Sequence, residues 1–258
     1  KAVSYYLHPD SSLQAKPPRK RNAYTTYNFD PADPVPTVGG NISSLATLRP
    51  IPPYITDPAT LPRTMRVEQI VVAGGWDQRE REDVFGARPP YNMPLSNRHD
   101  VLVFQTLPLE QNIEVTGPIE VNLWVASDSP DTDFTAKLID VYPPNEDYPN
   151  GFALNISDSI FRMRYRNSWE KPDIMKPGEV YQAIITLYPT SNIFAQGHRI
   201  RLDVSSSNFP RFDVNPNTGE PLGLNVRTQV AINTIHHSAD WPSHVVLPVV
   251  ALPSASQS

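Results

Sequence analysis

The chain has 258 residues, a formal net charge of −5, 29 prolines and no cysteine. Without cysteine it cannot form disulfides, use a thiol nucleophile or bind a metal through thiolates. The acidic balance argues against a nucleic-acid or anionic-membrane partner, and no apolar run approaches the ~20 residues of a membrane span. The length suits one all-β domain with short, interrupted strands, because proline fixes φ and lacks a backbone donor.

The first predicted strand covers Ala2–Leu7, and a long proline-rich segment at residues 14–66 follows it. We expect this segment to wrap over a surface, since so long a stretch without periodicity is typical of functional or connecting loops. Its residues 29–38 are rich in proline and should be extended and stiff. The chain should then turn sharply at Gly39 and Gly40, because glycine tolerates the positive φ of tight turns.

Strand signals recur from residue 67 onward, and minor helical turns are expected near residues 77–83 and 221–229. Apolar side chains occupy alternate positions in residues 119–125 and again in residues 199–204. This period of two is typical of a sheet with one buried face, so a series of such strands predicts a two-sheet antiparallel β-sandwich. The predicted strands are residues 67–73, 100–106, 113–116, 119–127, 133–141, 153–156, 160–167, 180–188, 199–206, 230–236 and 244–249.

No arrangement of residues in the sequence is typical of a catalytic site, so we predict that no residue of this chain is catalytic. A serine hydrolase of the α/β class needs Gly-x-Ser-x-Gly, whose glycines allow the sharp turn that exposes the nucleophile. The one glycine pair with this spacing, Gly219 and Gly223, brackets Pro221, which has no nucleophilic group. A self-sufficient hydrolase with an unfamiliar site remains the alternative, and a fluorophosphonate probe would reveal its serine.

The polar residues that could bind a metal lack the required spacing, so we predict no metal and no cofactor. His236 and His237 are neighbours, and neighbouring strand residues point to opposite faces of a sheet. The segment Asp213–Asn217 resembles the start of a calcium loop, but Gly219 comes one place late and Leu224 replaces the final glutamate. We interpret the segment as a turn held by Asn and Asp side chains, with bound calcium as the less favoured alternative.

Three arginines, Arg162, Arg164 and Arg166, alternate with apolar residues and should lie in a row on one strand face. We interpret them as partners of nearby carboxylates, and the alternative is an interface with an acidic surface of another domain. The polar segments 77–80 and 131–134 should form buried ion-pair networks if they lie inside the fold.

Seven sequence blocks carry a family resemblance, and together they cover nearly the whole chain in order. They are Asp30–Gly40 (DPADPVPTVGG), Asp77–Arg79, Arg98–Leu102, Ser129–Pro143, Phe161–Arg166, Gly197–Gly219 and His244–Pro248. In these blocks the chain resembles the C-terminal, non-catalytic domain of X-prolyl dipeptidyl peptidases and the related CocE/NonD serine hydrolases. That group includes cocaine esterases, α-amino-acid ester hydrolases and glutaryl-cephalosporin acylases.

The resemblance implies a jelly-roll β-sandwich, similar to galactose-binding domains, that forms a single accessory domain over residues 1–258. It implies as partner the α/β-hydrolase catalytic domain of the same polypeptide, which would carry the serine triad. The substrate of that parent enzyme would be an ester or an amide, with X-Pro peptides among the candidates. Residues 43–66 and 84–97 depart from compact relatives, and we interpret them as insertions.

The resemblance also implies where this domain meets the substrate. In relatives the segment after the glycine turn lies near the substrate cleft, so we expect Gly39, Gly40, Asn41 and Ile42 to line that cleft. Packing on the catalytic domain further predicts an exposed apolar patch, because interfaces between domains of one chain bury about 600–1,500 Å².

The alternative function is a carbohydrate-binding module, since jelly-roll domains often bind sugars. Such a module needs exposed aromatic side chains on one sheet face. Trp124 or Trp169 could provide them.

Overall fold

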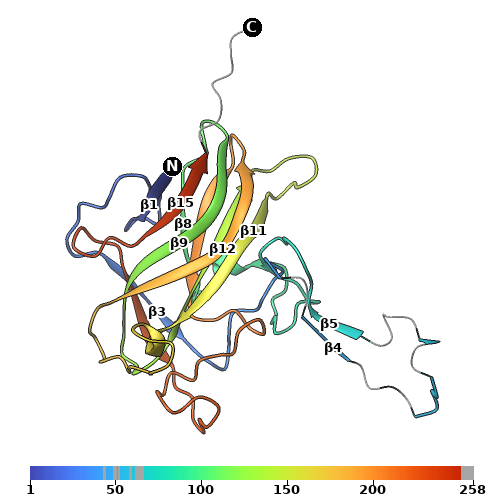
Figure 1. Cartoon of the computed structure of the whole chain (residues 1–258). Coiled ribbons are helices and arrows are strands. Elements are labelled where there is room, and N and C mark those ends of the chain that lie inside the picture. The colour runs from blue at the N-terminus through green and yellow to red at the C-terminus, as the bar shows by residue number, and fades with distance from the viewer. Residues whose placement is uncertain (43–44, 49–50, 52, 58–59, 62–66, 251–258) are drawn as a thin grey trace.

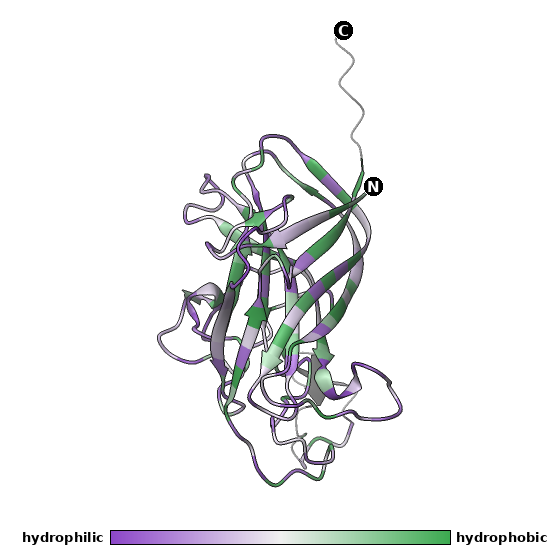
Figure 2. Cartoon of the chain, turned by 90° about the vertical axis from the view of Figure 1, so that its left-hand side faces the viewer, coloured by the Kyte–Doolittle hydropathy of each residue, from purple (hydrophilic) through white to green (hydrophobic). Residues whose placement is uncertain are grey.

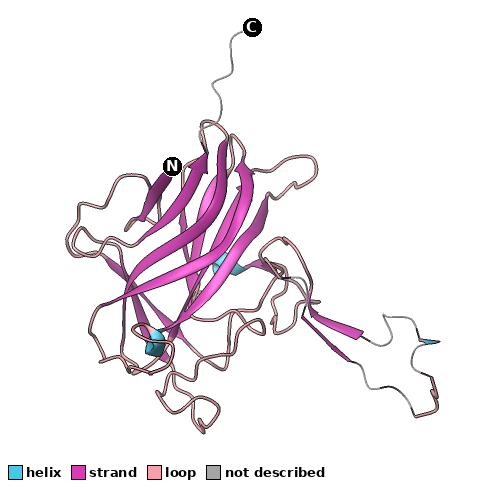
Figure 3. Ribbon diagram, in the orientation of Figure 1, coloured by secondary structure: helices cyan, strands magenta, loops and turns pink. Residues whose placement is uncertain are grey.

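The computed structural model of the chain describes residues 1–42, 45–48, 51, 53–57, 60–61 and 67–250. Strands dominate it, and two short 3₁₀ turns, η2 (Leu95–Asn97) and η3 (Met163–Tyr165), lie between them (Figure 3). In chain order the strands are β1 (Ala2–Leu7), β2 (Leu13–Gln14), β3 (Tyr24–Phe29), β4 (Leu45–Leu48), β5 (Val67–Val71), β6 (Arg79–Glu80), β7 (Met93–Pro94), β8 (Leu102–Gln105), β9 (Ile113–Ser127), β10 (Asp133–Tyr142), β11 (Phe152–Arg162), β12 (Tyr181–Phe194), β13 (Arg199–Ser205), β14 (Ala231–His236) and β15 (His244–Val250).

Two antiparallel sheets face each other in a β-sandwich, which confirms the predicted fold class. The larger sheet has seven strands in the order β2-β1-β15-β9-β14-β3, with β12 also paired to β9. The smaller sheet has the order β11-β10-β13-β8, and β4 pairs with β5 in an arm that projects from the sandwich (Figure 1). The jelly-roll winding, the likeness to galactose-binding domains and the single domain over residues 1–258 stay predictions.

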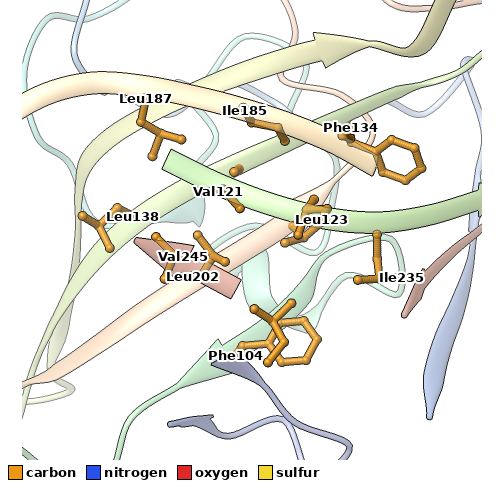
Figure 4. Close-up of a cluster of buried hydrophobic side chains, with 14 of the residues drawn as sticks. Phe104, Val121, Leu123, Phe134, Leu138, Ile185, Leu187, Leu202, Ile235 and Val245 are labelled. Atoms are coloured by element: carbon orange, nitrogen blue, oxygen red, sulfur yellow. The ribbon is translucent and has the colours of Figure 1, made fainter. Parts of the chain in front are cut away.

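The core forms between the sheets because the strands alternate between apolar and polar residues (Figure 2). In β9 the side chains of Val121 and Leu123 are fully buried, whereas Glu120 on the other face is exposed. Phe134 and Leu138 of β10 oppose them from the smaller sheet (Figure 4). Burying a side chain of this size contributes about 1.5–3 kcal/mol, so this double row holds the two sheets together.

The smaller sheet is covered on its outer face as well. We call the covering residues 29–42 and 74–101 the second layer. Its apolar residues form a separate small core against the sheet, and β10 is consequently buried on both faces along residues 133–140. The buried apolar residues of the second layer are Val35, Val38, Leu95 and Val101.

Several expected boundaries differ from the observed ones. The strands predicted at residues 113–116 and 119–127 are one strand, β9, because its pairing with β12 continues past Gly117 through a register shift. Strand β3 lies inside the segment predicted to be irregular, where Tyr27 and Phe29 are buried. The turns expected near residues 77–83 and 221–229 are not helical.

The two predicted insertions differ in how far they can be traced. Half of residues 43–66 lie outside the described residues, and the described half includes β4. Residues 84–97 lie in the second layer, where they form turns, β7 and η2. No helix in the described part of the chain is long and apolar enough to cross a membrane.

Candidate functional site

The four residues predicted to face a substrate lie in the second layer, and the structure divides them into two pairs. Gly39 and Gly40 are buried, whereas Asn41 and Ile42 are partly exposed. Both glycines have positive φ, 58° and 110°. The backbone N–H of Gly40 donates to the carbonyl of Gly74 at 2.7 Å, which joins the two strips of the second layer.

Glycine is required at this turn for steric reasons. A Cβ on Gly39 would lie 2.4 Å from Cδ1 of Trp76, far closer than atoms approach in proteins. A Cβ on Gly40 would lie 3.0 Å from Nδ2 of Asn155 and 3.1 Å from Oδ2 of Asp158. A side chain at Gly39 would therefore collide with Trp76, and one at Gly40 would require Asn155 and Asp158 of β11 to shift.

A buried polar network connects the Gly39–Ile42 turn to β11. We call Asn41, Asn155, Asp158, Asn208 and Arg211 the Asp158 cluster. Arg211 forms an ion pair with Asp158, and its Nη1 donates to Oδ1 of Asn41 at 2.7 Å. Asn208 and Asn155 donate to Oδ2 of Asp158 at 3.0 and 3.3 Å.

The Asp158 cluster is held in place by the backbone around it. The backbone N–H of Arg211 donates to Oγ1 of Thr37 at 3.2 Å. Thr37 and Phe209 are joined by a 2.7 Å backbone hydrogen bond, and Phe209 donates to the carbonyl of Val35 at 2.9 Å. Residues 35–37 thus run beside the segment that follows β13. The position of Asn41 is set by this backbone pairing and by its hydrogen bond to Arg211.

Burial makes this cluster costly to disrupt. Asp158 is fully buried, and Arg211 has a side-chain exposure of 8%. Two buried charges repay their desolvation only when each stays paired and hydrogen-bonded. Three buried amide atoms of the cluster have no hydrogen-bond partner among the described residues, so the network retains capacity for further contacts; they are Nδ2 of Asn41 and Oδ1 of Asn155 and Asn208.

A buried lysine lies on the same face of the smaller sheet. Lys137 of β10 is 5% exposed, and its Nζ reaches Oε1 of Gln78 at 3.4 Å. Burial lowers the pKa of Lys137, while the nearby carboxylates of Asp158 and Asp203 oppose the shift. The cavity beside it has a volume of about 10 Å³, which is at the lower limit for one water and too small for a substrate.

The segment 77–80, predicted to be an ion-pair network, is part of the second layer. Arg98 joins the layer by ion pairs to Glu80 and Asp100 at 3.0 and 2.8 Å. Arg79 pairs with Asp77 at 2.5 Å, and Asp77 also accepts the backbone N–H of Ala153 in β11. These bonds attach the second layer to the sheet that it covers.

The arginines of the Phe161–Arg166 block do not share one strand face, because β11 ends at Arg162 and η3 follows. Each nevertheless has a carboxylate partner, as our preferred interpretation expects. Arg162 pairs with Asp133 at 2.8 Å and Arg164 with Asp131 at 2.7 Å. The two aspartates are fully buried, which confirms the ion-pair network predicted at residues 131–134.

The third arginine and the segment Asp213–Asn217, which was predicted to be a turn, complete this region. Arg166 pairs with Asp173 at 2.7 Å. In the loop, Nδ2 of Asn215 donates to Asp131 and Asp133, and Oδ1 of Asn215 accepts the backbone N–H of Asn217 at 2.9 Å. The segment is a turn held by its own side chains, and the described residues hold no group of three or more metal-ligating side chains.

The histidines offer no hydrolytic site among the described residues. Nδ1 of His198 is hydrogen-bonded to Oδ1 of Asp140 at 2.9 Å, and the His198 ring contacts the tilted ring of Tyr142. His237 contacts Oγ1 of Thr25 at 2.9 Å. In the described part of the chain, neither histidine links a serine hydroxyl to a carboxylate, as a catalytic triad requires.

Comparison with known proteins agrees with this architecture. The family model of the X-Pro dipeptidyl-peptidase C-terminal non-catalytic domain matches residues 1–246. The chain is 38% identical over 230 residues to the cocaine esterase of Rhodococcus sp. (strain MB1 Bresler), covering 87% of this chain and 32% of that protein. It is 28% identical over 133 residues to a putative serine esterase of Mycobacterium bovis, covering 45% of this chain and 20% of that protein.

Solved structures of hydrolases also resemble this chain over about a third of their length. An aminopeptidase from a marine sediment Thaumarchaeota archaeon has a TM-score of 0.75 and 28% identity, covering 97% of this chain and 37% of its own. An α-amino acid ester hydrolase has a TM-score of 0.73 and 30% identity, covering 96% and 36%. The chain thus spans about a third of the length of the relatives that it matches. It belongs to the family of C-terminal non-catalytic domains of X-Pro dipeptidyl-peptidase and CocE/NonD-type hydrolases.

Proposed function

We propose that this chain is the accessory domain of a serine hydrolase, and that it packs on an α/β-hydrolase catalytic domain and forms part of its substrate cleft. The parent enzyme would transfer the acyl group of an ester or amide to water through a serine ester. The nucleophile, the base and the oxyanion site would lie on the catalytic domain. This chain would contribute binding and orientation of the substrate.

The Gly39–Ile42 turn carries the proposal. Its two glycines are buried, its next two side chains are partly exposed, and the Asp158 cluster binds it through a hydrogen bond from Arg211 to Asn41. A cleft wall needs this combination, because residues that position a substrate must be held to about 0.5 Å by their surroundings. Asn41 could offer its amide and Ile42 its apolar side chain to the substrate.

Exposed apolar side chains in the second layer support the same location for the catalytic domain. Phe85, Tyr91 and Met93 are 48%, 38% and 41% exposed. All three come from residues 84–97, and Phe85 contacts the ring of Phe209 beside the Asp158 cluster. Exposed apolar residues of this kind mark interaction surfaces, and here they lie in the same layer as the proposed cleft wall.

The test uses the full-length polypeptide that carries this domain. Ile42→Ala and Asn41→Ala should raise KM for a p-nitrophenyl ester or an X-Pro p-nitroanilide several-fold, with a smaller change in kcat. Ile193→Ala is the control, because Ile193 is exposed on β12 of the larger sheet. Unchanged KM in both cleft variants would refute the assignment of the cleft wall.

A second measurement separates the accessory role from the alternative of a self-sufficient hydrolase. The 258-residue chain is treated with a fluorophosphonate probe beside the full-length enzyme. The proposal expects labelling of the full-length enzyme and none of the isolated chain. Stoichiometric labelling of a serine in the isolated chain would overturn it.

A further inference from the structure

The outer face of the larger sheet has no covering layer among the described residues, and its composition is unusual for a plain solvent-facing surface. Alternation in β9 and β12 places Trp124 and Gln182 on this face, directly opposite each other in the ladder. In β15, His244 lies opposite Asn122 of β9 and beside Tyr6 of β1. We call the following residues the aromatic–amide face: Tyr6, Asn122, Trp124, Gln182, Trp241 and His244.

The aromatic side chains of this face are supported in place. The rings of Trp124 and Trp241 are in contact, with centroids 4.7 Å apart, and Trp241 remains 37% exposed. The backbone of Trp124 donates to Oγ of Ser243 at 2.9 Å, and Ser243 in turn donates to the carbonyl of His236. The two indole rings, whose planes are inclined by 54°, form an apolar surface that borders solvent, which we call the platform.

A row of amides runs beside the platform. Nε2 of Gln182 donates to Oδ1 of Asn122 at 3.3 Å, and Nδ2 of Asn122 donates to Oε1 of Glu120 at 2.8 Å. Asn122 is almost buried, whereas Gln182 and Glu120 are exposed. Asn122 thereby orients Gln182, which keeps one donor and its carbonyl for a ligand.

A cavity of about 620 Å³ continues from this row, because Gln182 lines it together with Tyr181 and Ile184. Its charged lining residues form two internal pairs. Arg166 pairs with Asp173 at 2.7 Å and also lies over the ring of Tyr181, and Lys176 pairs with Glu179 at 3.2 Å. The cavity therefore offers rings and hydrogen-bonding groups without net charge.

We propose that the cavity and the aromatic–amide face together bind a neutral oligosaccharide. A sugar ring has an apolar C–H face that packs on an aromatic ring, and hydroxyl groups around its edge that bond to amides. The paired charges disfavour an anionic ligand, and the exposed amides disfavour a purely apolar partner, whose burial would leave them without hydrogen bonds. The volume accommodates one or two sugar rings, and the platform beside it extends the binding surface.

This inference is independent of the proposed hydrolase role. The Gly39–Ile42 turn lies over the smaller sheet, and the aromatic–amide face lies on the opposite side of the sandwich. Both surfaces could therefore be occupied at once, and a sugar-binding surface would hold the parent enzyme on a glycan.

The experiment measures the migration of the 258-residue chain in native gels that contain mixed-linkage β-glucan, xylan, galactomannan or dextran, with polygalacturonate as an anionic comparison. Any neutral polymer that retards the chain is followed by calorimetric titration with the matching hexasaccharide. Trp124→Ala and Gln182→Ala should each weaken binding about tenfold. Trp124→Phe should restore part of the affinity, because it keeps a ring at the platform.

Tyr54→Ala is the matched control, since Tyr54 is 79% exposed and lies outside this surface. It should bind as the unaltered chain does, and circular dichroism establishes that each variant is folded. No retardation by any neutral polymer, or equal binding by Trp124→Ala and the control, would overturn the proposal. Concentration-dependent dimerisation that Trp124→Ala abolishes, without sugar binding, would assign the face to a second copy of the chain instead.

Discussion

The two outer faces of the sandwich differ in what covers them and in which groups they carry. The outer face of the smaller sheet lies under the second layer and contains buried charges, Lys137, Asp158 and Asp203. The outer face of the larger sheet is open and carries rings and amides, with Trp124 as its centre. Buried charges are costly unless paired, so they hold a segment in one geometry, whereas exposed uncharged groups remain free to meet a ligand.

The largest expected effect comes from breaking the buried ion pair on the covered face. Arg211→Met leaves Asp158 buried without its partner, and we expect a loss of about 3–5 kcal/mol in the free energy of unfolding. Urea denaturation of the 258-residue chain measures it. Arg227→Met is the control, because Arg227 is 70% exposed in its pair with Glu220 and should cost less than about 1 kcal/mol. Similar losses in the two variants would show that the covered face is no more dependent on its charges than the surface.

The next effect tests the close approach of the Gly39–Ile42 turn to β11. Gly40→Ala adds a Cβ near Asn155 and Asp158 at a positive φ, so we expect a loss of about 1–3 kcal/mol. Gly74→Ala has a similar φ of 89°, but its Cβ would meet no atom within 4 Å. The difference in unfolding free energy between the two variants measures the cost of crowding Asn155 and Asp158. Equal losses in urea denaturation would contradict a close-packed turn.

A smaller effect concerns the buried lysine on the same face. Burial lowers the pKa of Lys137 in the folded chain, whereas an unfolded lysine titrates near ~10.4. Between these two values the unfolded chain holds one more proton, so the free energy of unfolding rises with pH, by about 1.4 kcal/mol for each unit of lowering. Lys137→Met should remove this alkaline rise, and an unchanged pH profile would mean that Lys137 titrates as a free lysine.

The smallest effect belongs to a buried histidine that directly follows β14. Burial lowers the pKa of His237, which contacts Thr25 and the ring of Phe104. Its contribution to stability is present above ~6.5, the pKa of an unfolded histidine, and is lost as the pH falls through the lowered folded value. His237→Gln keeps a donor to Thr25. Below ~6.5 it should reduce the slope of the free energy of unfolding against pH by at most about 1.4 kcal/mol per pH unit. Burial also lowers the pKa of the neighbouring His236, but this residue is present in both the unaltered chain and the variant.

Much of the fold could be predicted because strand alternation is a local property. The side chains of residues 119–125 alternate in the sequence, and the apolar ones at 119, 121, 123 and 125 are all buried in β9. Where prediction failed, distant partners had decided the outcome. Residues 24–29 lie among prolines, and β3 exists because β14 pairs with it over its whole length.

The candidate site could be predicted only in part for the same reason. The glycine turn was evident from Gly39 and Gly40, because no other residue adopts their φ so readily. The sequence carried no signal for the pairing of Asp158 with Arg211, which are 53 residues apart. Asp158 of β11 and Arg211, which follows β13, are brought together only once β11 and β13 have both paired with β10. Likewise Trp124 and Trp241 become a platform only when β9 and β15 form one sheet.

Local chemistry, then, determined the alternating strands, the absence of thiol chemistry and the position of the tight turn, because each depends on composition or on neighbouring residues. Tertiary structure decided which face was covered, which charges became partners and which rings met at the surface. These outcomes depend on burial and on contacts between distant segments, and desolvation acts on a group only once the chain has folded around it.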